Sequence, residues 1–156
     1  MGKQILGAVG LIGGILALVG IFTPWATLST AWGGSVSMSA WDSITEAEIL
    51  GQPAERETYC LLAFAGSILA LVGALLAVFA PSMKVPWAIL VVGGVLAIIG
   101  AVWGLSDIET GSILGISVSY GYGLYLTLAG GVLAFLAFLG AIAMRQPTTN
   151  VPTPSQ

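Results

Sequence analysis

Few side chains in this chain have the chemistry of a catalytic site. The 156 residues include no histidine and one cysteine, Cys60. Nucleophilic catalysis needs a base beside a Ser, Cys or Thr nucleophile, and the sequence offers no such set. A single cysteine excludes a disulfide within the chain. Cys60 stands at the start of an apolar segment, and we interpret it as a small core residue. We therefore expect no enzyme activity and no cofactor.

Two carboxylate pairs are the remaining candidates for ligand chemistry. Glu46 with Glu48, and Asp107 with Glu109, could bind calcium weakly, because Ca²⁺ prefers carboxylate oxygens. We interpret both pairs instead as a solvated acidic rim, since no wider cluster with metal-ligand spacing accompanies them. The Gly-Gly pairs lie inside apolar segments and follow no strand, so they do not indicate a phosphate-binding loop. The sequence predicts no metal centre.

The composition decides which elements must carry these groups. Hydrophobic residues make up 57% of the chain and charged residues 7%, with a mean hydropathy of +1.01. A soluble domain carries roughly a quarter charged residues, and a disordered chain is polar, so both classes are excluded. Four Lys and Arg residues are too few for a nucleic-acid interface. The sequence therefore predicts an integral membrane protein in contact with membrane lipid.

Four apolar segments are long enough to cross a bilayer as helices, which takes about 20 residues. They lie at about 5–23, 59–80, 87–105 and 120–144, and none contains an ionisable residue. Proton and ion pathways normally need such residues inside the membrane, so a transporter is disfavoured. The first segment resembles a cleaved signal peptide only loosely. We expect it to be the first span, because it is close to full spanning length.

The charges predict the orientation of the chain. Four spans place Lys3, Lys84 and Arg145 on one side, and all seven acidic residues with Arg56 on the other. The positive-inside rule then predicts a multi-pass protein of the cell membrane with both termini in the cytoplasm. The loops 24–58 and 106–119 face outward. We expect one four-span domain over 1–145 and a flexible cytoplasmic tail over 146–156, which is too polar to build a core.

Each span carries a stripe of small residues at positions separated by four and then three residues, which returns to one helix face. The stripes are Gly13, Ala17 and Gly20; Gly66, Ala70 and Gly73; Gly93, Ala97 and Gly100; and Gly130, Ala134 and Ala137. Small residues let membrane helices approach closely. The stripes predict a tight four-helix bundle, with the alternative that one stripe faces outward and makes an oligomer contact.

The outer loops carry strand signals. Alternation over 35–41 and a second candidate strand at 26–31, separated by Gly33-Gly34, predict a hairpin. A short helix should begin at Asp42, with Ser43 and Glu46 as its capping box, and end near Gly51. The segment near 115–120 also alternates. Because a lone hairpin is marginal in water, we expect these strands to form one small antiparallel sheet that couples the first and fourth helices.

This arrangement resembles the claudin-type tetraspan superfamily. Trp25 and Trp41 stand where that family has the tryptophans of its first-loop signature, and Arg56 stands near its basic residue outside the second span. Ser39-Ala40 replace the family's Gly-Leu, and its cysteine pair is absent. The resemblance implies an all-α membrane fold, a four-helix bundle with an extracellular sheet from both outer loops. The loop would be held by packing alone.

The sequence thus predicts a non-enzymatic tetraspan protein that acts by assembly, as a structural or cell-surface component. We expect a homo-oligomer or contacts with other membrane proteins, through an outer surface of Trp25, Trp32, Trp41 and Arg56. Trp32, at the expected hairpin tip, is the leading contact, although it could also fold back onto the sheet or lie among lipid headgroups. Two alternatives are an accessory subunit of a larger membrane complex and an oligomeric cation-permeable channel.

Overall fold

The computed structural model describes residues 2–50, 54–113 and 115–144. Five helices and four strands follow one another in the described chain: α1 (Gly2–Phe22), β1 (Pro24–Thr30), β2 (Ser35–Ser39), α2 (Ala40–Leu50), α3 (Ala54–Phe79), α4 (Val85–Asp107), β3 (Gly111–Ile113), β4 (Ile116–Tyr120) and α5 (Tyr122–Ala143). Four of these helices are long and apolar enough to cross a membrane: α1, α3 from Thr58, α4 and α5. The prediction of four long apolar helices is confirmed.

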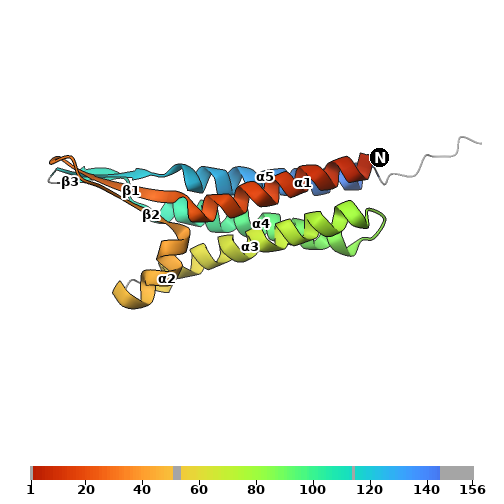
Figure 1. Ribbon diagram of the computed structural model, residues 1–156, viewed down its shortest axis with the longest axis horizontal. Coiled ribbons are helices and arrows are strands. Elements are labelled where there is room, and N and C mark those ends of the chain that lie inside the picture. The colour runs from red at the N-terminus through yellow and green to blue at the C-terminus, as the bar shows by residue number, and fades with distance from the viewer. Residues whose placement is uncertain (1, 51–53, 114, 145–156) are drawn as a thin grey trace, which may run out of the picture.

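The four long helices form a bundle of two closely packed pairs. The most extensive contacts join α1 to α5 and α3 to α4, and further contacts of α1 with α3 and of α4 with α5 complete the bundle. The start of α1, the turn between α3 and α4 and the end of α5 lie at one end of the molecule (Figure 1). The sheet and α2 lie at the opposite end, where the sheet continues the long axis of the bundle.

The strands form one antiparallel sheet in the order β2-β1-β4-β3. Because β1 follows α1, β4 precedes α5, and the two strands pair from Ala26↔Tyr120 to Thr30↔Ile116, the sheet couples the first and last helices of the bundle as predicted. The hairpin turn between β1 and β2 has Gly33 at φ +87°, a conformation that glycine adopts without steric cost. Strand β3 was not predicted, because its three residues are too few to show alternation.

The predicted start and capping box of the short helix were wrong. The helix begins at Ala40, so Ala40 and Trp41 do not extend β2. Its capping box is Ser39 with Asp42: the Ser39 amide donates to Asp42 Oδ2 at 2.8 Å, and the Asp42 amide donates to Ser39 Oγ at 3.1 Å. Ser43 instead donates its hydroxyl to the Ser39 carbonyl. An earlier Ser-x-x-acid pair thus performs the function expected of the later one. The predicted end at Gly51 lies outside the described residues.

The core is built of small residues with a few large side chains at each end. One cluster near the α3–α4 turn contains Trp87 and Leu90 among alanines. A second cluster, beneath the sheet, contains Ile21, Trp25 and Tyr59. The buried hydroxyl of Thr127 donates to the Gly123 carbonyl at 3.0 Å. Its internal partner removes the cost of leaving a polar group unpaired in an apolar interior.

Candidate functional site

The twelve small residues of the four stripes all lie at contacts between helices. A Cβ built on Gly13 would stand 2.7 Å from the Gly130 carbonyl oxygen, and one on Gly66 would stand 2.8 Å from the Gly93 carbonyl oxygen. The alanines of the stripes are between 0 and 1% exposed. The glycines are likewise buried inside the single chain. These residues hold the α1–α5 and α3–α4 pairs together and present no outward stripe for an oligomer contact.

Trp25 is not part of an exposed outer surface, contrary to our expectation. Its side chain is 3% exposed, and its indole N–H donates to the Gly20 carbonyl at 2.9 Å. The ring stacks on Tyr59 with centroids 6.3 Å apart and lies against Gly104. Trp25 therefore closes the top of the bundle beneath the sheet, where it fixes the exit of the chain from α1 into β1.

Trp41 is partly exposed and packs on the ends of two long helices. Its ring lies 5.3 Å from that of Phe22 and 5.4 Å from that of Phe64, measured between centroids. This contact fastens the start of α2 to α1 and α3, so the role of Trp41 in the described structure is internal. Arg56 belongs to α3 by its backbone, but its side chain lies outside what the structure describes, as do those of Glu46 and Glu48. The tail 146–156 also lies outside the described residues.

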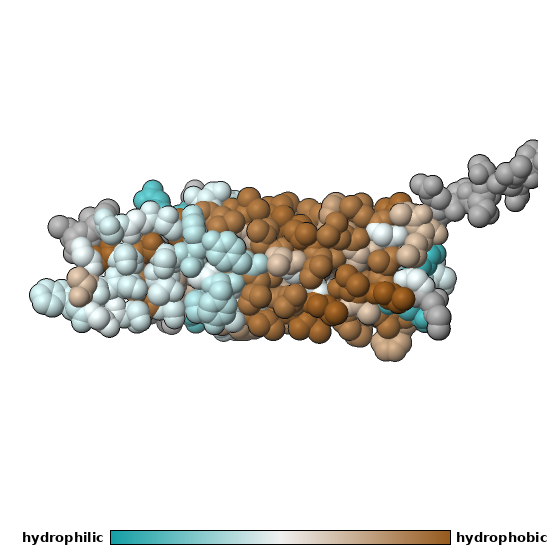
Figure 2. Space-filling model, turned by 90° about the horizontal axis from the view of Figure 1, so that it is seen from above, coloured by the Kyte–Doolittle hydropathy of each residue, from teal (hydrophilic) through white to brown (hydrophobic). Residues whose placement is uncertain are grey.

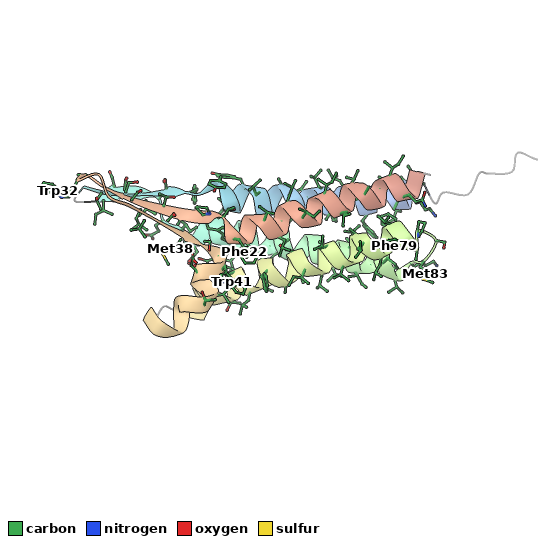
Figure 3. All side chains as sticks on the ribbon, viewed as in Figure 1. Phe22, Trp32, Met38, Trp41, Phe79 and Met83 are labelled. Carbon is green, nitrogen blue, oxygen red and sulfur yellow. The ribbon has the colours of Figure 1, made fainter. Side chains whose placement is uncertain are left out.

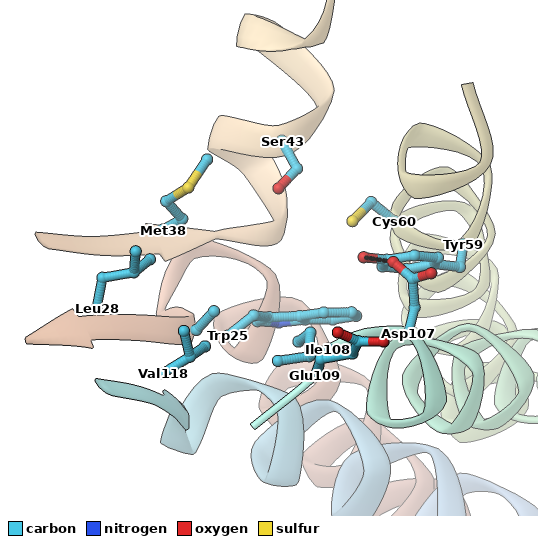
Figure 4. A pocket seen from close by; sticks show the side chains of 11 residues that line it. Trp25, Leu28, Met38, Ser43, Tyr59, Cys60, Asp107, Ile108, Glu109 and Val118 are labelled. Carbon is cyan, nitrogen blue, oxygen red and sulfur yellow. Dashed lines mark hydrogen bonds between the residues drawn. The ribbon is translucent and has the colours of Figure 1, made fainter. Parts of the chain in front are cut away.

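A pocket of about 400 Å³ opens between the sheet, α2 and the ends of α3 and α4 (Figure 4). Its walls include Leu28, Met38 and Val118 from the sheet and Cys60 from α3. The Tyr59 hydroxyl donates to Asp107 Oδ2 at 3.1 Å, so this carboxylate is held at the wall of the pocket. Among the described residues, no three His, Cys, Asp or Glu side chains come together in a way that could hold a metal ion.

Trp32 is the one predicted contact residue that the described structure leaves almost fully accessible, at 96% exposure. It occupies the turn of the β1–β2 hairpin, at the end of the molecule opposite to Phe79 and Met83 (Figure 3). A side chain this exposed does not fold back onto the sheet. Trp32 is also far from the helices, because a seven-residue strand spans roughly 20 Å.

The strand register gives the sheet two different faces. One face carries apolar side chains at paired positions, including Leu28, Val36 and Val118, and of these Leu28 and Val118 line the pocket. Beyond the irregularity between Pro24 and Ala26, the other face carries only hydroxyl side chains at its paired positions: Thr27, Ser29, Ser35, Ser37, Ser112, Ser117 and Ser119. Seen from the side away from α2, the sheet is pale and the helices are brown (Figure 2). Its outer face is therefore polar.

Neither face of the sheet carries a charge. No Asp, Glu, Lys or Arg occurs between Pro24 and Trp41 or between Thr110 and Tyr122. The nearest acidic residues, Asp42, Asp107 and Glu109, flank the base of the sheet, where it joins the helices. The sequence shows the absence of charge, but the shared hydroxyl face follows from a register between strands about 90 residues apart.

Comparison of the chain with known protein families and with curated proteins finds no match.

Proposed function

We propose that this protein is a non-enzymatic four-span membrane protein that acts by assembly through its outer sheet. The four helices would lie in the cell membrane with both termini in the cytoplasm. Two facts support this orientation. Lys3 and Lys84 lie at the end of the bundle away from the sheet, and Asp42, Asp107 and Glu109 lie at the sheet end. Basic residues favour the cytoplasmic side, so the sheet would project outside the cell.

The observation that carries the assembly proposal is the exposure of Trp32 at the outer tip of the sheet. The Trp32 side chain is 96% exposed to solvent. Tryptophan is a frequent anchor of protein interfaces, so its exposure at the tip favours a contact there. The headgroup region of its own membrane is out of its reach, because the whole length of β1 lies between Trp32 and the bundle. The absence of charge around it favours self-association, since two copies of the sheet would not repel each other.

The test is the mass of the native assembly, extracted in mild detergent and measured by light scattering. We expect a homo-oligomer, and we expect Trp32→Ala to weaken its association by about ten- to thirtyfold, the effect of truncating an interface anchor. Phe79→Ala is the control, because Phe79 is 79% exposed at the opposite end of the bundle and should leave the outer contact unchanged.

Two results would contradict self-association through the sheet. An oligomer that Trp32→Ala leaves intact would place the contact elsewhere. A fixed-ratio complex with one larger membrane protein would instead identify this chain as an accessory subunit, whose function depends on its partner.

A further inference from the structure

Strand β2 is an open edge of the sheet. It pairs with β1 on one side only. The Thr30 amide donates to the Gly34 carbonyl across the hairpin, and successive residues of a strand point their backbone groups to alternate sides. The amide and carbonyl groups of Val36 therefore face β1, while those of Ser35 and Ser37 face the open edge. The Ser39 amide, which would continue this row, already donates to Asp42.

No described element covers this edge at Ser35, Val36 or Ser37, and all three residues are exposed. Proteins normally protect an edge strand with a charged residue, a proline, a bulge or a covering helix. Strand β2 contains no charged residue and no proline, and the one irregularity of the β1–β2 pair lies at its far end, between Pro24 and Ala26. The other edge strand, β3, is only three residues long, which is itself a protection.

We propose that β2 pairs with β2 of a second copy of this chain, in antiparallel orientation, to form one continuous eight-stranded sheet. This inference rests on the proposed function and names the partner and the contact. The favoured register places Ser35 opposite Ser37 of the second copy, because it satisfies the outward amide and carbonyl of both residues. Val36 then stands opposite its own counterpart, and the two side chains, each 66% exposed, bury one another.

The pairing is self-complementary because the edge is uncharged. A two-fold axis perpendicular to the sheet keeps the two hydroxyl faces on one side and the two apolar faces on the other. Main-chain hydrogen bonds supply the affinity in such strand addition. A single contact of this length is weak, since a two-stranded pairing is marginal in water. Many copies in a membrane would act together and raise the overall strength.

The antiparallel orientation has a consequence for the membrane. The sheet continues the long axis of the bundle (Figure 1), so two copies paired in this way point in opposite directions. They would stand in two facing membranes and bridge the gap between them. In the same register, the turn with Trp32 lies level with Ala40 of the second copy. Ala40 is the first residue of α2, at the end of the sheet that joins the helix bundle. Trp32 would thus reach the surface of the opposite membrane, the level that tryptophan prefers.

The experiment uses a cysteine at the two-fold axis. Val36→Cys is introduced into full-length protein carrying Cys60→Ala, and the variant is reconstituted into two vesicle populations with different affinity tags. Val36 and its counterpart would form a non-hydrogen-bonded pair, whose Cα atoms lie about 4.5 Å apart, within the range of about 4.4–6.8 Å that a disulfide allows. We expect mild oxidation to yield disulfide dimers that carry both tags. Ser112→Cys, on the opposite edge, is the matched control and should give several-fold less.

Three further variants separate this inference from the proposed function. Ser37→Pro removes an outward amide and Ser37→Lys adds a protective charge, whereas Ser119→Lys adds the same charge to the same face away from the edge. We expect both Ser37 variants to abolish vesicle tethering and Ser119→Lys to retain it. Oligomers that persist without Val36 cross-links would overturn the β2 contact but not assembly. Protein that is monomeric at every density would overturn both.

Discussion

At the scale of single residues, the packing of the long helices depends on glycine and alanine, whose side chains are absent or small. A Cβ built on Gly100 would stand 2.6 Å from both the Ala63 amide nitrogen and the Tyr59 carbonyl oxygen. These are backbone atoms and cannot move aside as a flexible side chain would. Helix association in lipid relies on such close packing, because lipid tails offer no hydrophobic drive between apolar helices. A single methyl group at this contact should therefore separate α3 from α4.

We predict that Gly100→Ala destabilises the bundle by about 1–3 kcal/mol, the usual cost of overpacking. Gly111→Ala is the matched control, because a Cβ there meets no atom within 4 Å. Thermal unfolding in detergent, followed by circular dichroism, measures both changes. Equal melting temperatures for the two variants would contradict the close packing of α3 on α4.

Trp25 has an internal structural role, in contrast to the exposed Trp32. Its indole N–H is satisfied inside the molecule by the Gly20 carbonyl. Trp25→Phe keeps the aromatic ring but removes that donor and leaves the carbonyl without this bond. We predict a loss of about 1 kcal/mol in unfolding free energy, the typical value of one hydrogen bond. Trp103→Phe is the control, because the Trp103 side chain is 42% exposed. A larger loss of unfolding free energy from Trp103→Phe than from Trp25→Phe would contradict the structural role of the Trp25–Gly20 hydrogen bond.

At the scale of secondary-structure elements, α2 is fixed by its first turn. The reciprocal Ser39–Asp42 hydrogen bonds satisfy backbone and side-chain groups at the helix start, and Trp41 fastens the same turn to Phe22 and Phe64. The capping box also ends β2, because it uses the Ser39 amide that would otherwise continue the open edge. One local motif therefore sets both where the helix begins and how long the free edge is.

We predict that Ser39→Ala lowers the protection of α2 amides by an amount equivalent to about 1 kcal/mol, the usual cost of removing an N-cap. Ser43→Ala should have little effect, because the Ser43 hydroxyl only adds a donor to the Ser39 carbonyl. Hydrogen exchange of the peptide that spans the described helix measures both. The reverse order of effects would restore Ser43 as the cap and contradict the helix start at Ala40.

At the scale of the whole molecule, the two ends of the bundle differ in character. The sheet, α2 and the described acidic residues gather at one end, and Lys3 and Lys84 lie at the other (Figure 1). On the face shown in Figure 2, the surface of the long helices between them is largely hydrophobic. This division is what allows a charge rule to assign the sides of the membrane.

We predict that Ser82→Cys, in the exposed α3–α4 turn, reacts with an impermeant maleimide only after the cells are opened. Gly111→Cys, exposed in β3, should react on intact cells. Both cysteines are introduced with Cys60→Ala, so that the probe reports a single site. The opposite labelling pattern would place the sheet in the cytoplasm and remove the proposed contact between facing membranes.

The amino-acid sequence by itself determined the four apolar helices that indicate a membrane protein and the hairpin with Trp32 at its turn. These features depend on composition and on periodicities within about 20 residues, and hydropathy reports both directly. The sequence also showed that residues 24–41 carry no charge. It misplaced the cap of α2 because Ser39-x-x-Asp42 and Ser43-x-x-Glu46 offer the same local pattern.

Only the tertiary structure decided which surfaces remain open. Trp25 and Trp32 are seven positions apart in the segment between α1 and α2, yet one is 3% and the other 96% exposed. The close approach of α1, α3 and α4 covers Trp25, and nothing described reaches Trp32. The open edge of β2 likewise follows from the pairing of β1 with β4, across about 90 residues of sequence. Burial and strand order depend on which distant segments meet, and a local pattern of hydropathy does not contain that information.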